Sequence, residues 1–235
     1  MTTPLSQLSG RVWIYSGDPD PEAVQPCIAV VADDAGSTVV DAGQSPAHAR
    51  LAQSAMAKAG LPAARRLVYT HHHWDHTWGA CAWEVEEIVC HEAGAELLSA
   101  EASRPWSDEY LRQEVAANPR LRPSFQARAR AMNGNGWEDF AVRSPTRTFT
   151  ERLVLPGGVE LRHVGGNHAP DSTVVAIPDS SVMLLGDCFY PSPYHLREPG
   201  PVGEEIDLPQ ITALVAERFD WYVDSHSPPW RPPLS

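Results

Sequence analysis

The segment from residue 70 to residue 79 reads THHHWDHTWG and holds four side chains that could bind a metal ion within six residues: His71, His73, Asp75 and His76. The preceding Leu67–Thr70 is expected to be a strand, and Thr77–Trp83 a short helix. In an extended chain alternate residues share a face, so His71 and His73 point to the same side. Imidazole with carboxylate is a donor set that Zn, Fe or Mn accepts. The segment therefore predicts a metal site at a strand end, against the alternative of a His-rich surface turn.

Short apolar segments separated by Gly, Pro and Asp recur along the chain. They predict strands at Val12–Tyr15, Cys27–Ala32, Thr38–Val40, Leu67–Thr70, Ile88–Cys90, Phe149–Leu155, Val159–Val164, Thr173–Ile177, Val182–Leu185 and Trp221–Asp224. Helices are expected at 48–59 after Pro46, at 92–132 with breaks at Pro105 and Pro119, and at 208–219. This alternation predicts an α/β fold. We expect a four-layer αβ/βα sandwich of two mixed sheets with outer helices, a single domain over residues 1–235, with a Pro-rich tail at Ser227–Ser235.

The middle of the chain, at about residues 92–150, is predicted to form a helical cap or insertion. Between Arg104 and Arg152 there are nine Arg against six acidic residues, so this segment carries +3 while the remainder carries −15. A positive cap over a metal site would attract a carboxylate or phosphate on a substrate. Arginines on solvated helix faces are the alternative. The aromatic residues of the block either line a pocket or anchor the cap to the core.

The net charge of −12 opposes binding to nucleic acid or to an anionic membrane surface. The longest apolar runs are strand-sized, so no membrane span is expected. The first residues, MTTPLSQLSGRVW, lack the basic start and apolar stretch of a signal peptide. The four scattered cysteines indicate reduced thiols. We therefore expect a cytoplasmic protein that binds a small molecule, without nucleic-acid or membrane partners.

The H-x-H-x-D-H pattern at a strand end resembles the signature of the metallo-β-lactamase fold superfamily, and the resemblance covers nearly the whole chain. Three later segments follow the family order: GGNHAPDST with His168, MLLGDCF with Asp187, and WYVDSHSPP with His226. Carried over to this chain, the resemblance implies a first metal site of His71, His73 and His168 and a second of Asp75, His76 and His226, with Asp187 as the bridge. Asp41 in VVDAG resembles the family Asp that holds a ligand histidine through its other ring nitrogen. A turn-forming Asp before Gly43 is the competing interpretation.

The resemblance implies two divalent metal ions, with Zn as the default and Fe or Mn as alternatives. Two such ions can share a hydroxide that attacks a carbonyl, so no Ser or Cys nucleophile is required. Asp75 is placed to orient that hydroxide. Tyr190, three residues after Asp187, resembles a tyrosine that binds the substrate carbonyl in lactonases of this fold. An ordinary loop tyrosine is the alternative.

Asp187 favours a glyoxalase II-like or lactonase-like hydrolase of carboxylic esters, lactones or thioesters, because β-lactamases of this fold carry Cys or Ser there. Two departures from the family pattern stand out: Gly166-Asn167 replaces Pro-Gly before His168, and the helical extension of glyoxalase II is missing after His226. The alternative function is a mononuclear iron-dependent persulfide dioxygenase, which would not keep the second site. We also expect the small-molecule substrate to be anionic and the protein to form a homodimer.

Overall fold

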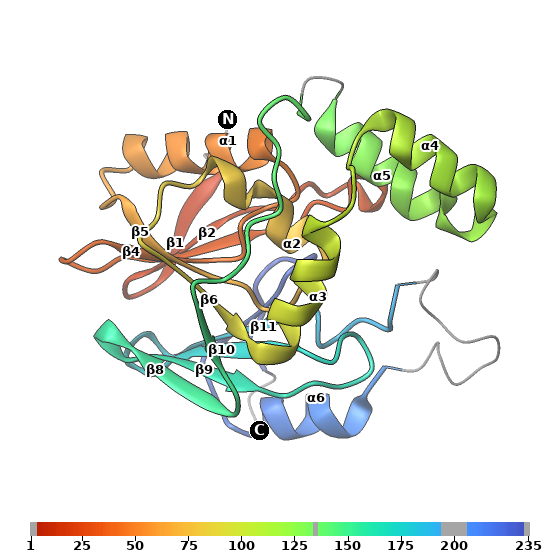
Figure 1. Ribbon diagram of the computed structural model, residues 1–235. Helices are drawn as coiled ribbons and strands as arrows, with labels where there is room; N and C mark the ends of the chain where they lie inside the picture. The colour runs from red at the N-terminus through yellow and green to blue at the C-terminus, as the bar shows by residue number, and fades with distance from the viewer. Residues whose placement is uncertain (1–3, 134–135, 194–205, 233–235) are drawn as a thin grey trace.

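The computed structural model describes residues 4–133, 136–193 and 206–232. Two β-sheets pack face to face, and helices cover their outer faces (Figure 1). Helix α1 (Pro46–Lys58) lies over the first sheet and α6 (Leu208–Val215) over the second. The fold is therefore the α/β arrangement of two mixed sheets with outer helices that the sequence predicted.

The first sheet has seven strands, which follow one another across the sheet in sequence order. They are β1 (Leu5–Ser9), β2 (Val12–Tyr15), β3 (Ile28–Val31), β4 (Ser37–Val40), β5 (Ala64–Val68), β6 (Glu87–His91) and β7 (Arg147–Phe149). The pairs from β1 to β4 are antiparallel, and those from β4 to β7 are parallel. The sheet is therefore mixed, because a meander is extended by strands that return through helices.

The second sheet has five strands in the order β12-β11-β10-β9-β8. Their bounds are β8 (Arg152–Leu155), β9 (Val159–His163), β10 (Thr173–Ile177), β11 (Val182–Gly186) and β12 (Trp221–Asp224). Strands β8 to β11 pair antiparallel, whereas β11 and β12 are parallel and are connected through α6. This sheet is also mixed.

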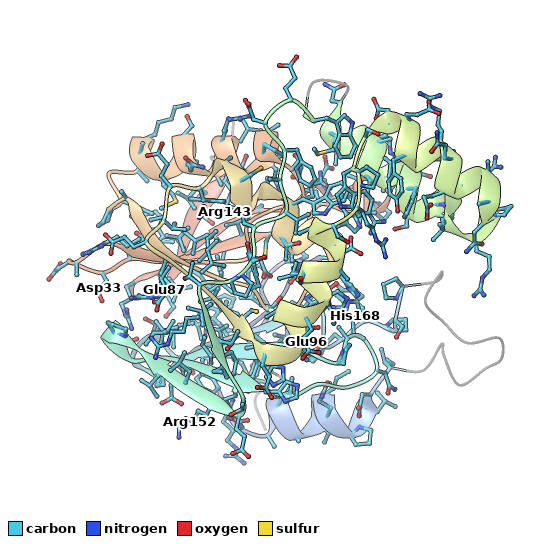
Figure 2. All side chains as sticks on the ribbon, in the orientation of Figure 1. Asp33, Glu87, Glu96, Arg143, Arg152 and His168 are labelled. Atoms are coloured by element: carbon cyan, nitrogen blue, oxygen red, sulfur yellow. The ribbon has the colours of Figure 1, made fainter. Side chains whose placement is uncertain are left out.

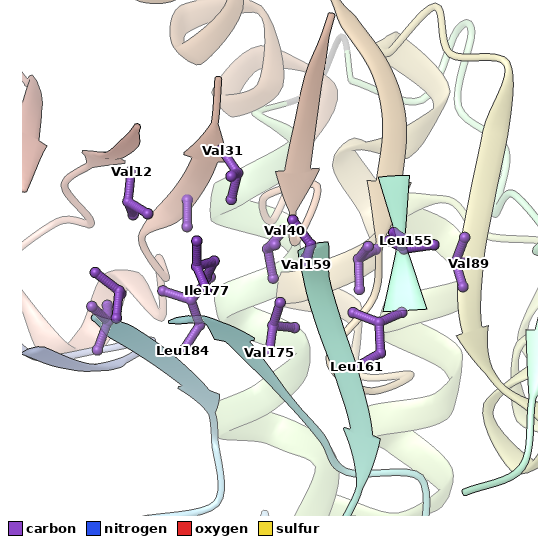
Figure 3. Close-up of a cluster of buried hydrophobic side chains, with 14 of the residues drawn as sticks. Val12, Val31, Val40, Val89, Leu155, Val159, Leu161, Val175, Ile177 and Leu184 are labelled. Atoms are coloured by element: carbon purple, nitrogen blue, oxygen red, sulfur yellow. The ribbon is translucent and has the colours of Figure 1, made fainter. Parts of the chain in front are cut away.

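Successive residues of a strand point to opposite faces of its sheet. One face of each sheet therefore packs against the other sheet, and the opposite face packs against the outer helices. On β11, Val182 and Leu184 point into the layer between the sheets, while Met183 and Leu185 pack beneath α6 with Leu214. Figure 3 shows the layer between the sheets, with side chains from both sheets in contact. Every residue of β10 and β11 is buried, which explains why their sequences read as continuous apolar runs.

Helix α1 begins where the sequence carries a capping signal. The Ser45 hydroxyl accepts a hydrogen bond from the His48 amide at 3.2 Å, and Pro46 occupies the first helical position. The remaining helices are α2 (Trp74–Thr77), α3 (Glu92–Ala102), α4 (Asp108–Ala117) and α5 (Arg122–Met132). Short 3-10 helices lie at Pro21–Ala23, Trp78–Ala82, Pro119–Leu121, Pro156–Gly158 and Pro178–Ser180. Helices α4 and α5 pack against each other beside the sheets (Figure 1).

Several elements differ from the prediction; the short helix predicted at Thr77–Trp83 begins earlier, as α2 at Trp74, and continues as the 3-10 helix Trp78–Ala82. Strand β1 was not expected, and the single strand predicted at Phe149–Leu155 is two strands in different sheets, β7 and β8. Helix α6 ends at Val215 and not at residue 219. The described part of the Pro-rich end is no free tail, because Trp230 forms a β-bridge with Tyr222 and stacks on its ring. Between Phe149 and Arg152 the chain passes from the first sheet to the second through Thr150 and Glu151. The sheet that each strand joins depends on distant partners, so the local pattern of apolar residues could not predict this break.

Among the described residues, no helix combines the length and apolarity needed to cross a membrane.

Candidate metal centre

Seven side chains that can bind metal ions converge at one edge of the two sheets. They form two groups, His71, His73 and His168, and Asp75, His76, Asp187 and His226. Within each group the donor atoms lie within 4.8 Å of one another. The first sheet supplies four of them from the segment that follows β5 and enters α2, and the loops beside β10, β11 and β12 supply the other three. In Figure 2, His168 is labelled on the loop that precedes β10.

The first group is a triangle of imidazole nitrogens. His71 Nε2 lies 2.9 Å from His73 Nδ1 and 3.2 Å from His168 Nε2, and His73 Nδ1 lies 3.0 Å from His168 Nε2. Burial, and then the neighbouring imidazoles, lower the pKa of His71 and of His73 well below the usual value. Both rings are therefore neutral at neutral pH, and neutral imidazole is the form that binds a metal ion.

The second group alternates carboxylates and imidazoles. His76 Nε2 lies 3.4 Å from Asp75 Oδ2 and 3.3 Å from Asp187 Oδ1, and His226 Nε2 lies 3.3 Å from Asp75 Oδ2. Burial alone would lower the pKa of His76, but the carboxylates of Asp187, Asp41 and Asp75 outweigh it and raise this pKa well above its usual value. Against burial, Asp187 and Asp75 likewise raise the pKa of His226 to about 10. The group is therefore built to hold positive charge.

Asp187 belongs to both groups. Its Oδ2 lies 3.3 Å from His168 Nε2 in the first group and 3.4 Å from His226 Nε2 in the second. Its Oδ1 faces His76 Nε2 at 3.3 Å, yet neither of these buried atoms has a hydrogen-bond partner among the described residues. Four donors at about 2.0–2.1 Å from a tetrahedral zinc ion lie about 3.3 Å from one another. The donor set and its spacing therefore fit divalent metal ions, and Asp187 could serve as a ligand in both groups.

Asp41 lies against His76 at the side remote from the second group. Its Oδ2 is 2.8 Å from His76 Nδ1, and its carboxylate also accepts hydrogen bonds from the Thr70 amide at 2.8 Å and from the Thr70 hydroxyl at 3.0 Å. Asp41 has a φ of 63°, a left-handed conformation that Asp tolerates better than most residues. The carboxylate fixes the ring so that Nε2 faces the other donors, which is the place the family resemblance implied for it.

Tyr190 lies in the loop after β11, but its hydroxyl does not point at the two groups. It donates a hydrogen bond to Asp224 Oδ1 at 2.6 Å and lies 3.0 Å from Ser227 Oγ. Its ring packs edge-on against His226, with centroids 5.5 Å apart. Burial, and then the Asp224 carboxylate, raise the pKa of Tyr190, so the phenol keeps its proton. The hydroxyl that was predicted to donate a hydrogen bond to a substrate carbonyl therefore donates it to Asp224 in this structure.

Sequence reasoning missed two residues that support the site. Asp171, which is buried, lies 2.8 Å from Nδ1 of His72, the histidine in the middle of the cluster. Asp224, also buried, holds Tyr190 and stands two residues before His226. The only available signal was position: Asp171 follows His168 by three residues, and Asp224 ends β12.

A cavity of about 1210 Å³ opens beside both groups and extends beneath α3, α4 and α5. His73, Asp75, His168, Asp187 and His226 line one end of it. Leu97, Leu121, Pro123 and Phe125 are among the apolar residues from the helical segment that line the rest. A site that can hold metal ions therefore faces a space large enough for a small organic molecule.

The family model of the metallo-beta-lactamase superfamily matches residues 22–222. The chain therefore belongs to the metallo-beta-lactamase superfamily and has its hydrolase-type fold, and the expected class of metallohydrolase is confirmed at this level. No curated protein matches the sequence.

Several solved structures share the fold at low sequence identity. A metallo-beta-lactamase from Pontibacter korlensis is 18% identical with a TM-score of 0.59, over 97% of this chain and 92% of that one. A metallo-beta-lactamase from Hirschia baltica is 15% identical with a TM-score of 0.62, over 97% and 91% of the two chains. A stereoselective inverting sec-alkylsulfatase from Pseudomonas sp. is 20% identical with a TM-score of 0.66, over 97% of this chain but 39% of that one. At these identities the likeness concerns the fold.

Proposed function

We propose that this chain is a metal-dependent hydrolase that cleaves a carboxylic ester, lactone or thioester and holds two divalent ions, with zinc as the default and Fe or Mn as alternatives. The observation that carries the proposal is the position of Asp187, whose carboxylate lies within 3.4 Å of imidazole donors in both groups. One carboxylate between two sets of donors is an arrangement suited to a pair of metal ions.

When bound, two such ions lower the pKa of a water molecule and polarise the carbonyl group of a substrate. The residues of the chain would position that water and the substrate. Asp75 lines the cavity, and its Oδ2 lies 3.3 Å from His226 Nε2, so its carboxylate can accept a hydrogen bond from a water molecule at the cavity end of the site. Loss of Asp75 is therefore expected to affect both metal binding and the rate.

A covalent route through cysteine is disfavoured. Cys188 follows Asp187 directly, but burial and the Asp187 carboxylate raise the pKa of its thiol to about 12. Burial also raises the pKa of Cys27 and that of Cys90 to about 12. A thiolate is the nucleophilic form, and these thiols stay protonated at neutral pH.

The substrate class rests on the resemblance and on the cavity. Asp187 stands where β-lactamases of this fold carry Cys or Ser, which favours the lactonase-like and glyoxalase II-like members. The apolar lining supplied by the helical segment suits the acyl part of a small ester or lactone. All four cysteines are free thiols, which supports the cytoplasm as the proposed compartment.

Metal content tests the proposal first. Elemental analysis of protein purified without a metal-binding tag should give about two equivalents of divalent metal per chain. His73→Ala and Asp187→Ala should lower this number while the protein stays folded. His163→Ala is the matched control, because His163 stacks on His91 outside both groups and should leave the metal content unchanged.

A screen of esters, lactones and thioesters then tests the reaction. Hydrolysis that falls in parallel with the metal content of the two variants would support the proposal. A single equivalent of iron in the wild type, together with oxygen uptake and no hydrolysis, would replace it with the mononuclear dioxygenase.

A further inference from the structure

Arg128 on α5 is buried in a cage of aromatic rings. Its guanidinium carbon lies 4.8 Å from the centre of the Phe125 ring, 5.1 Å from that of Trp74, 5.5 Å from that of Trp78 and 5.8 Å from that of Trp106. The residue is only 7% exposed. Aromatic faces attract a cation, but they accept none of its five N–H groups as a carboxylate does.

No acidic partner neutralises this guanidinium within the described part of the chain. Its one hydrogen bond there is from Nη1 to the Ser124 hydroxyl, and its Nε is buried without an acceptor. Other arginines of the helical segment and of the strands after it are ion-paired; they are Arg104 with Glu101, Arg112 with Glu109, Arg130 with Glu22, Arg147 with Glu87 and Arg152 with Glu160. Because a buried charge is costly when unpaired, Arg128 is an anomaly that calls for a partner.

Arg128 lines the same cavity as the metal-binding groups. Burial, partly offset by Glu101 and Asp75, lowers the pKa of Arg128 to about 10, so the side chain stays charged at neutral pH. The cavity holds four arginines and seven acidic residues, which are Arg104, Arg120, Arg128 and Arg130, and Asp18, Asp20, Glu22, Asp75, Glu101, Glu114 and Asp187. Such a negative surrounding opposes a doubly charged phosphate more strongly than a singly charged carboxylate, so a carboxylate is the anion more compatible with this cavity.

We propose that Arg128 binds a carboxylate of the substrate, and that the substrate class is an ester, lactone or thioester bearing a free carboxylate away from the reacting carbonyl. The rings hold the planar guanidinium in one orientation, which matches the planar carboxylate better than a flexible ammonium group would. The reacting group in this statement rests on the proposed function. The carboxylate site is independent of it.

Two nitrophenyl esters of equal length test the selectivity. In 4-nitrophenyl hydrogen glutarate a carboxylate stands where 4-nitrophenyl pentanoate has a methyl group. For the wild type we expect the higher kcat/KM with the glutarate ester. Arg128→Met should raise KM for the glutarate ester roughly 10- to 100-fold and leave KM for the pentanoate ester nearly unchanged, since hydrogen bonds to charged groups have this magnitude. Arg128→Lys keeps the charge but not the planar fork, and should recover only part of the selectivity.

Arg112→Met is the matched control, because Arg112 lies on α4, is largely exposed and is not among the residues that line the cavity. It should change neither KM. Equal changes of both Michaelis constants in Arg128→Met, or unchanged selectivity in both Arg128 variants, would overturn the carboxylate site. Melting temperatures of all variants identify any effect that comes from loosening the aromatic cage.

A binding measurement separates this inference from the proposed reaction. Three tryptophans surround Arg128, so glutarate added to the metal-free protein should change the intrinsic fluorescence in a saturable way, and Arg128→Met should abolish the change. If neither ester is hydrolysed but the saturable fluorescence change is seen, the result contradicts the proposed ester hydrolysis and still supports the carboxylate site. If the esters are hydrolysed and Arg128→Met binds glutarate as the wild type does, the carboxylate site is wrong.

Discussion

Asp41 lies outside the two candidate metal-binding groups, but its carboxylate contacts residues of the segment that supplies four of their side chains. Its carboxylate accepts two hydrogen bonds from Thr70, two residues after β5, and lies 2.8 Å from Nδ1 of His76. These contacts fix both the start of the ligand segment and the orientation of one ligand. Among the described residues, the hydrogen-bond contacts of its side chain are with Thr70 and His76, so we expect Asp41 to act on the candidate metal centre through these two residues.

Asp41→Asn should weaken metal binding at the second group. Asn also tolerates the left-handed conformation, so the backbone is kept while the negative charge against His76 is lost. Such partners of ligand histidines are worth about 10- to 100-fold in metal affinity. Competition with a chromophoric chelator measures the dissociation constants. Asp33→Asn, on the surface beside Arg11, is the control, and an unchanged affinity in Asp41→Asn would show that the carboxylate is dispensable.

Tyr190→Phe distinguishes the two roles open to this residue. The hydroxyl holds Asp224 and Ser227 on either side of His226, so we expect its loss to raise the metal dissociation constant of the second group about 10-fold. Activity should then recover when the metal concentration is raised. A lower kcat at full metal content would instead support donation to the substrate carbonyl, and no effect on either quantity would dismiss both roles.

The sequence could predict those site residues that lie close together in the chain or follow the order of a known family. His71, His73, Asp75 and His76 form a local motif, and His168 was found through its order in the family. Arg128 and Asp171 belong to no recognisable sequence pattern. The unpaired guanidinium of Arg128 and the contact of Asp171 with His72, 99 residues away, exist only in the folded chain.

At the scale of elements, alternation of apolar residues predicted most strands, and the two failures have physical causes. Strand β1 has the sequence LSQLS, which is too polar to stand out, and it is held as an edge strand by pairing with β2. Strands β7 and β8 read as one apolar run, but β7 pairs with β6 and β8 with β9. Which sheet a strand joins depends on distant partners and not on its own composition.

Leu161→Ala should test the layer between the sheets. Leu161 on β9 is fully buried there, so its truncation should lower the free energy of unfolding by about 2–5 kcal/mol. Val154→Ala on the neighbouring β8 is the control. Val154 is 52% exposed, so this substitution should lower the free energy of unfolding by less than about 1 kcal/mol. Urea denaturation of the metal-free proteins gives both values. Equal effects would mean that the layer is not a tightly packed core.

For the whole molecule, the ligand groups join the two sheets. The segment after β5 comes from the first sheet, whereas His168, Asp187 and His226 come from the second. Metal ions at these groups would therefore hold the two layers together as well as serve the reaction.

Removal of metal should lower the melting temperature. A ligand at about 100 times its dissociation constant stabilises the folded state by about 2.7 kcal/mol, which corresponds to about 5–10 °C for a chain of this size. Differential scanning calorimetry with and without a chelator measures the shift. Asp187→Ala should show little dependence on the chelator, and an unchanged wild-type melting temperature would contradict a site that joins the sheets.

The spacing of the ligands along the chain also has a consequence for how the protein is made. Four of the seven lie between residues 71 and 76, and the last lies at residue 226. A growing polypeptide thus exposes a short chelating segment long before the second sheet has been synthesised. An unfolded or newly synthesised chain that already binds metal gains less from folding, so only the affinity added by the three late ligands is available to drive closure of the two layers.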